Sequence, residues 1–113
     1  MLKKKYRLPI KAKLTYSSAV KSQTFLLKIS QNSLPLSRFG FIIGKKIDKR
    51  SVVRNRTKRV IRSCIEELLE KIKEGYDMLF ILQKNAVDKK RHEFYSEIEK
   101  VLSEKQLINK QPI

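Results

Sequence analysis

The residues of this sequence that could do chemistry are mainly basic, and many of them gather in one stretch, residues 44–62. That stretch holds nine Lys or Arg and a single acid, Asp48. A guanidinium group can grip a phosphate through two parallel hydrogen bonds, and Asn55, which lies between two arginines, can donate to and accept from a base or a ribose. The stretch therefore predicts binding to a polyanion.

The sequence does not indicate catalysis by the chain's own side chains. The first 47 residues contain no carboxylate, and the one histidine, His92, is remote from the basic stretch. The later acids fall at the spacing of solvated helix faces, whereas a catalytic site needs groups that converge. One Cys and one His cannot build a zinc site. We assign no catalytic residue and no organic cofactor, and we leave any metal ligand on the protein unassigned.

The net charge of +16 over 113 residues lies wholly in the first 62 residues. A field of this size on a small domain attracts nucleic acid or an anionic membrane. No run of about 20 apolar residues could span a bilayer, and the lysines at 3–5 are not followed by the apolar segment of a signal peptide. The single cysteine, Cys64, suits a small core residue in a reducing, cytoplasmic setting. We therefore expect a nucleic-acid partner and no membrane.

Periodicity predicts that the basic residues from 51 onward lie on a helix that spans 51–73 and ends at Gly75, a residue suited to the left-handed position after a helix. Its apolar residues form one stripe that must pack on a core: Val53, Val60, Ile61, Cys64, Ile65, Leu68, Leu69 and Ile72. Asn55, Arg56, Arg59 and Arg62 point away from the stripe, with Arg54 and Lys58 along one edge.

The charges of this helix are placed against its own dipole. The N-terminal end of a helix favours acids, yet the cations come in the first half and Glu66, Glu67, Glu70 and Glu74 in the second. A helix face that is merely solvated usually mixes signs in i,i+4 pairs. The order observed here costs stability unless a polyanion is bound, which again indicates a partner.

The remaining patterns predict a sheet and a second long helix. Residues 24–30 alternate as a strand with one buried face, and 38–44 form a second strand that we expect to be its antiparallel neighbour. Within it, Gly40 marks a bend or the close approach of another backbone. The apolar run 76–83 fits a buried central strand, and residues 88–105 fit an amphipathic helix that covers the sheet.

We expect one domain over residues 1–113, since the chain is too short for two ordinary cores. Its ends are less ordered in this prediction. Residues 1–8 form a basic arm, a short helix spans about 9–16, and residues 109–113 form a frayed tail.

The string FGFIIGKKIDKRSVVRNRTKRVIR, residues 39–62, resembles the signature of the bacterial ribonuclease P protein component. It contains an FGF strand, a lysine pair, a short basic turn and an R-N-R-x-K-R-x-x-R helix. The later Gly75-Tyr76-Asp77 and the closing helix match the same family in order and spacing. The resemblance covers nearly the whole chain.

The resemblance implies an α/β (α+β) single-domain sandwich with the order αβββαβα, in the class of the second domain of ribosomal protein S5. A four-stranded sheet is packed by helices, and the fourth strand would lie near 45–47. The basic helix would lie in an unusual left-handed crossover, although chirality rules alone favour the right-handed form.

The resemblance also implies a function. Family members bind the catalytic RNA of ribonuclease P and the 5′ leader of precursor tRNA, and assist Mg²⁺-dependent removal of the leader by that RNA. The implied contacts to the catalytic RNA are Lys45, Lys46, Lys49, Arg50, Arg54, Asn55, Arg56, Lys58, Arg59 and Arg62. The implied contacts to the leader are Arg7, Tyr16, Phe25, Lys28 and Arg38.

Two other functions stay open at this point. A structural protein that binds ribosomal RNA would be equally basic, and a basic helix could read the major groove of duplex DNA. The chain also departs from the family at its start, because the first helix is several residues short and Tyr16 is the only aromatic residue between Tyr6 and Phe25. Phe39 and Phe41 suit either the core or a stacking platform for bases.

Overall fold

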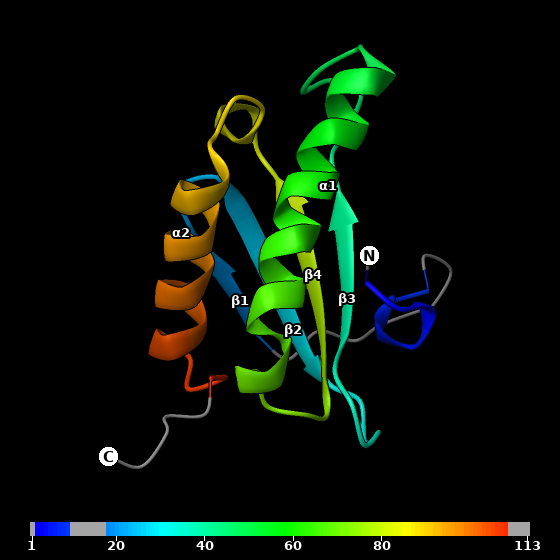
Figure 1. Ribbon diagram of the computed structural model, residues 1–113, viewed down its shortest axis with the longest axis vertical. Coiled ribbons are helices and arrows are strands. Elements are labelled where there is room, and N and C mark those ends of the chain that lie inside the picture. Colours follow the sequence, from blue (N-terminus) through cyan, green and yellow to red (C-terminus); the bar gives the residue numbers. More distant parts are fainter. Residues whose placement is uncertain (1, 10–17, 109–113) are drawn as a thin grey trace.

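A four-stranded sheet with two helices on one of its faces forms the body of the protein (Figure 1). The computed structural model describes residues 2–9 and 18–108. The strands are β1 (Ser18–Lys21), β2 (Phe25–Gln31), β3 (Arg38–Ile42) and β4 (Tyr76–Leu82). The helices are α1 (Ser51–Leu68) and α2 (Arg91–Glu104), with short 3-10 turns η1 (Lys4–Tyr6), η2 (Leu69–Lys71) and η3 (Lys84–Ala86).

The strand order is β1-β2-β4-β3, so the apolar run of β4 takes the interior position predicted for it. β4 pairs antiparallel with β2, from Phe25 opposite Leu82 onward, and parallel with β3. The prediction that 24–30 and 38–44 are antiparallel neighbours is therefore wrong. β2 and β4 are the two interior strands, and β4 separates β2 from β3.

The connection from β3 through α1 to β4 is left-handed. In Figure 1, β3 and β4 both run upward, α1 lies in front of the sheet, and β4 lies to the left of β3. This confirms the expectation from the family resemblance and runs against the general preference for right-handed crossovers.

The fourth strand is β1, and the prediction of a strand near 45–47 is wrong. Residues 45–47 form a turn in which the Ile47 N–H donates to the Gly44 carbonyl at 3.0 Å. β1 pairs with β2 over four residues, too few to leave a clear alternation in the sequence. The order from β1 onward is βββαβα as expected, and the helix predicted at 9–16 falls almost wholly outside the described residues.

The core lies between the sheet and the helices. Alternate residues of β2 and β4 face the helices, and the α1 stripe packs against them. Fully buried members include Phe25, Leu27, Met78, Phe80, Ile61, Cys64, Ile65, Leu68, Phe94, Ile98 and Leu102. Thr57 joins the stripe because its hydroxyl donates to the Val53 carbonyl at 2.9 Å, while Val60 and Leu69 are only half-buried. Burial raises the pKa of the Cys64 thiol.

The α1 helix ends earlier than predicted. η2 follows it, and Ile72 then turns to extended backbone, forms a bridge with Ile108 and is buried. The C-terminal segment, rather than a further helical turn, covers Ile72. Gly75 has φ +91, the left-handed region that favours glycine, but it lies in the turn into β4, where its carbonyl accepts the Asn32 N–H at 2.9 Å.

The N-terminal segment wraps the free edge of β3. The Leu8 N–H donates to the Phe39 carbonyl at 2.9 Å, and Leu2 is buried as a member of the core cluster. On the other face of the sheet, a Cβ at Gly40 would lie 3.2 Å from the Leu8 side chain. The Leu79 side chain would be closer still, at 3.1 Å, so Gly40 leaves room for neighbouring side chains rather than for the predicted approach of another backbone. The basic arm of the sequence prediction is thus anchored at both ends and covers a sheet edge.

Two carboxylates, the buried Asp77 and the half-buried Glu97, hold separate elements together. Asp77 of β4 accepts two hydrogen bonds from the Arg38 guanidinium, at 2.8 and 2.7 Å, and one from Asn32 at 2.9 Å. Burial acts to raise the pKa of Asp77, but these hydrogen bonds hold it below its ordinary value. A buried acid on β4 therefore stays ionised and fixes the start of β3.

The second carboxylate, Glu97 of α2, holds the turn between β1 and β2. It accepts the Thr24 N–H at 2.9 Å and the hydroxyls of Ser22 and Thr24, and it pairs with Lys89 at 3.0 Å. Burial acts to raise the pKa of Glu97, and the hydrogen bonds again bring it below the ordinary value.

Both carboxylates predict a loss of stability in acid. A group whose folded pKa is lowered stabilises the fold above its unfolded pKa, and the contribution disappears as pH falls through the folded value. We expect the free energy of unfolding in urea to fall between about pH 5 and about pH 3. Asp77→Asn should cost about 2 kcal/mol or more at pH 7, since it breaks a buried ion pair, and should flatten this pH dependence. An unchanged pH dependence in Asp77→Asn would contradict the assignment.

Candidate nucleic-acid interface

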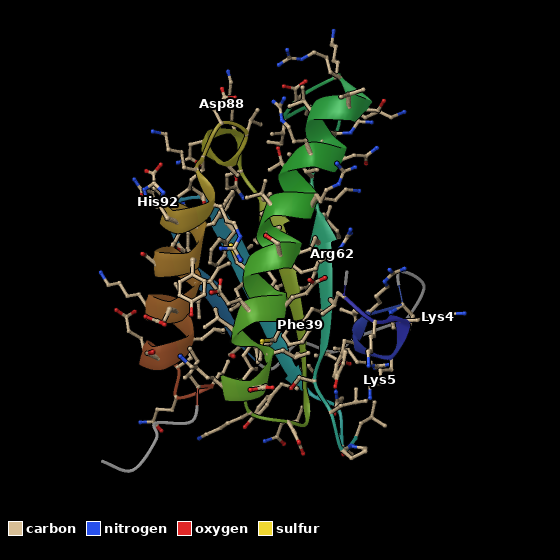
Figure 2. The ribbon with its side chains drawn as sticks, in the orientation of Figure 1. Lys4, Lys5, Phe39, Arg62, Asp88 and His92 are labelled. Atoms are coloured by element: carbon tan, nitrogen blue, oxygen red, sulfur yellow. The ribbon has the colours of Figure 1, made fainter. Side chains whose placement is uncertain are left out.

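The basic residues of the sequence prediction meet on one surface, formed by the loop 44–50 and the outward side of α1. Figure 2 shows nitrogen-bearing side chains gathered around the first turns of α1. The exposed members are Lys45, Lys46, Lys49, Arg50, Asn55, Arg56 and Arg59, and the half-buried ones are Arg54, Lys58 and Arg62. We call these residues the α1 basic face.

The loop before α1 is built around its one acid. The Asp48 carboxylate accepts the backbone N–H of Arg50 at 2.9 Å and two hydrogen bonds from the Arg50 guanidinium, at 3.0 and 2.9 Å. The hydrogen bonds from Arg50 are the main reason that the pKa of Asp48 falls to about 2. Arg50 is thus partly neutralised within the protein.

Arg54 closes the same loop onto the first turn of α1. Its Nη1 donates to the carbonyls of Asp48 and Lys49, each at 2.9 Å. Within the described part of the chain, Arg56 and Arg59 have no such acceptor. The α1 basic face therefore combines arginines that shape the protein with arginines whose donors are available to a ligand.

The N-terminal segment brings further cations, of which the sequence prediction included only Arg7 among the site residues. Lys3, Lys4, Lys5 and Arg7 are all exposed, and the segment that carries them is fixed to β3. The signal that could have identified this arrangement is the pair Leu2 and Leu8, which bracket the lysines and are both buried.

The five residues predicted to contact a single strand do not form one group. Arg7 is exposed, with its Nε donating to the Leu2 carbonyl at 3.2 Å, and Tyr16 lies outside the described residues. Arg38 forms an ion pair with Asp77, so its guanidinium already has a partner within the protein. Phe25 is fully buried, with its ring edge-on to Phe80 at 5.1 Å, so it lies in the core and has no surface for a ligand.

Lys28 lies on the sheet face that α1 and α2 do not cover, and the register places apolar residues beside it. Lys28 is opposite Leu79, and Leu26 and Ile42 both flank Ile81. These side chains are half-buried, apart from Ile42, which is 45% exposed. We call Leu26, Lys28, Ile42, Leu79 and Ile81 the outer sheet face. It offers an apolar surface with a cation, which suits unstacked bases joined by phosphates.

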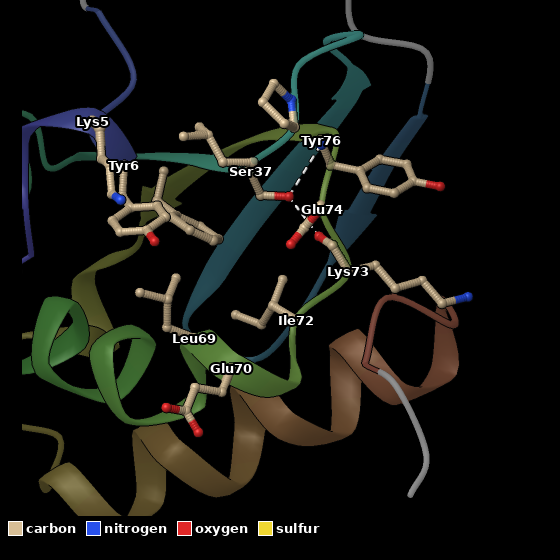
Figure 3. A pocket seen from close by; sticks show the side chains of 12 residues that line it. Lys5, Tyr6, Ser37, Leu69, Glu70, Ile72, Lys73, Glu74 and Tyr76 are labelled. Carbon is tan, nitrogen blue, oxygen red and sulfur yellow. Dashed lines mark hydrogen bonds between the residues drawn. The ribbon is translucent and has the colours of Figure 1, made fainter.

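A pocket of 680 Å³ lies at the opposite end of α1, between η1, η2 and the start of β4 (Figure 3). Its polar floor is satisfied internally, because the Ser37 hydroxyl donates to the Lys73 carbonyl at 2.6 Å and accepts the Tyr76 N–H at 3.1 Å. Glu70 and Glu74 on the rim oppose a polyanion. This pocket is therefore not part of the basic surface.

Neither a metal cluster nor a membrane segment is found in residues 2–9 and 18–108. These residues contain no group of three or more His, Cys, Asp or Glu that could hold a metal ion. None of their helices combines the length and apolar character of a bilayer-spanning segment.

Comparison with known proteins gives a consistent result. A family model described as Ribonuclease P matches residues 3–106. The ribonuclease P protein component of Alkaliphilus oremlandii is 34% identical over 88 residues, 78% of this chain and 76% of that protein. That of a Cyanothece species is 35% identical over 78 residues, 69% of this chain but only 60% of that protein.

Solved structures agree with the fold. The structure of the Staphylococcus aureus RNase P protein has a TM-score of 0.71 at 25% identity, over 81% of this chain and 84% of that one. The RNase P protein from Thermotoga maritima, at 19% identity, has a TM-score of 0.70 over 77% of this chain and 82% of that one. The second likeness concerns the fold alone.

The role of Arg54 in the loop can be tested without a ligand. Arg54→Ala removes both hydrogen bonds to loop carbonyls, so we expect faster amide hydrogen exchange in residues 47–50 and a loss of about 1 kcal/mol of stability. Arg59→Ala is the matched control, since it removes an exposed arginine of the same helix. Equal exchange in both variants would show that Arg54 does not hold the loop.

Proposed function

The chain belongs to the ribonuclease P protein family, and from that premise we propose that it is the protein subunit of a bacterial ribonuclease P. In this role it binds the catalytic RNA and the 5′ leader of precursor tRNA, and it assists the endonucleolytic removal of the leader. The chemistry of cleavage belongs to the RNA. The protein contributes affinity and placement.

The observation that carries this proposal is the α1 basic face. Arg56 and Arg59 are exposed, project from a helix anchored by its apolar stripe, and have no protein acceptor within the described residues. Asn55 lies between the arginines at 54 and 56, with its amide exposed. Fixed cations on a rigid helix favour a folded RNA whose phosphates stand at fixed positions, because little ordering remains to be done on binding.

For the leader we propose the outer sheet face. Its half-buried leucine and isoleucine side chains would contact the bases of a single strand, and Lys28 would lie near its phosphates. Arg7 is exposed at the sheet edge beside β3, where it would add a cation near this surface. Phe25 has no part in this contact. Arg38 has a structural role, because its ion pair with Asp77 fixes the start of β3.

Cleavage of this kind requires Mg²⁺, which we propose is bound mainly by the RNA. The acid nearest the α1 basic face in sequence, Asp48, already accepts three hydrogen bonds from Arg50. It is therefore poorly placed to serve as a metal ligand. We further propose a cytoplasmic setting, on the ground that the single cysteine is a buried core residue.

The runner-up function is a structural protein of the ribosome that has no processing role. Basic surfaces of this kind are common to both classes, but the match to the Ribonuclease P family model does not favour the ribosomal alternative. Co-purification with ribosomal subunits, rather than with a single RNA of a few hundred nucleotides, would support this alternative.

The proposal predicts an effect on the Mg²⁺ requirement. When the purified protein is added to its cognate RNA, precursor tRNA should be cleaved at a lower Mg²⁺ concentration than by the RNA alone, because the cations replace part of the screening that Mg²⁺ provides. The measurement is the initial cleavage rate across a Mg²⁺ titration. The same rate with and without protein at every Mg²⁺ level would overturn the proposed function.

A second prediction concerns single charges of the α1 basic face. Arg56→Ala or Arg59→Ala should each weaken RNA binding by about 1 kcal/mol and reduce the slope of log affinity against log salt by about one, if each arginine neutralises one phosphate. Lys100→Ala, an exposed cation on α2, is the matched control and should change neither quantity. Equal effects at positions 56, 59 and 100 would mean that the binding is not directed by α1.

A further inference from the structure

Arg62 differs from the other arginines of the α1 basic face, because an aromatic side chain supports it. Its guanidinium carbon lies over the ring of Phe41, 5.7 Å from the ring centroid. Figure 2 shows Arg62 on the part of α1 that lies beside β3. Arg62 is half-buried, whereas Arg56 and Arg59 are exposed.

The ring of Phe41 is itself held by the core. It stacks on Phe80 with the centroids 5.5 Å apart and the planes 17° apart. Phe80 is fully buried on β4 and meets Phe25 edge-on at 5.1 Å. A row of three rings therefore runs from β2 through β4 to β3 and ends at the guanidinium of Arg62.

This arrangement has a consequence for binding. A free arginine side chain loses rotational freedom when it grips a phosphate, and that loss reduces affinity. A guanidinium stacked on an aromatic face has already lost part of that freedom, and its edge donors remain available for a phosphate. Arg62 is thus ordered before any ligand arrives.

Contact with the core accounts for only part of the ring at position 41. The side chain is only half-buried, although it lies on the helix-facing side of β3. An aliphatic side chain of similar size would fill the inner part of the same space. It would not offer a flat face to a guanidinium.

We propose that Phe41 is a positioning residue for RNA binding, and that its ring holds Arg62 in the orientation in which the guanidinium donates to a phosphate of the RNA. The inference rests on the proposed function and assigns a specific role to a residue that does not itself contact the ligand.

The test is a double-mutant cycle on affinity for the catalytic RNA, measured with the full chain. Arg62→Ala should weaken binding about fivefold, and Phe41→Leu about threefold. The double variant should be no weaker than Arg62→Ala alone, since Phe41 acts through Arg62. Phe41→Tyr keeps the ring face and should bind like the original chain.

The matched control pairs Phe41→Leu with Arg59→Ala, which has no aromatic support. Here the two losses should multiply, to about fifteenfold. Losses that multiply in the Arg62 pair as well would overturn the positioning role and leave the proposed function standing. If Arg62→Ala, Arg56→Ala and Arg59→Ala all bind like the original chain, the proposed function itself fails.

A measurement on the unsubstituted protein covers the case in which Phe41→Leu does not fold. The order parameter of the Arg62 Nε–H, from NMR relaxation of the free protein, should be clearly higher than that of Arg59. Equal order parameters for the two arginines would overturn the inference.

Discussion

Burial of the apolar stripe of α1 against the sheet is the interaction on which the rest of the structure depends. Ile61, Cys64, Ile65 and Leu68 are completely buried, and burial of each large aliphatic side chain contributes about 1.5–3 kcal/mol. The electrostatic costs that oppose formation of the helix are individually smaller. A like-charge pair one helical turn apart costs about 0.2–0.5 kcal/mol, and a cation near the N-terminus about 0.3–1 kcal/mol. The helix can therefore carry an uncompensated positive face.

The cations of the chain divide into two groups that composition cannot separate. Arg38 is held by Asp77, Arg50 by Asp48, and Arg91 by Ser63 and Glu67, while Arg54 ties the loop to α1. The hydrogen bonds and ion pairs of these arginines stabilise the fold. A second group, including Arg56 and Arg59, is exposed on a surface that the first group shapes. The net charge describes the attraction to a polyanion, whereas the hydrogen bonds determine which residues can contact it.

The sequence predicted where the strands and helices lie better than it predicted which strands pair with each other. The apolar run 76–83 and the alternation in 24–30 were sufficient to identify β4 and β2, but local patterns carry no information on pairing, so β3 was placed beside the wrong strand. β1 was missed because four residues give no clear period. Phe25 could have been excluded from the surface, since the alternation that predicted its strand also assigns it to the buried side. The loop bonds of Arg50 and Arg54 depend on a turn geometry that residue types alone do not define.

The most direct test of the account is to map which RNA lies beside α1. A hydroxyl-radical source tethered through Val52→Cys, a position that is 75% exposed at the start of α1, should cut the catalytic RNA at a few defined sites. Cys64 is fully buried and should stay unreactive. The same source tethered through His92→Cys, on the side of α2 away from α1 (Figure 2), should cut weakly or not at all. Cutting of equal strength from both positions, or from position 92 alone, would contradict the claim that the α1 basic face binds the RNA.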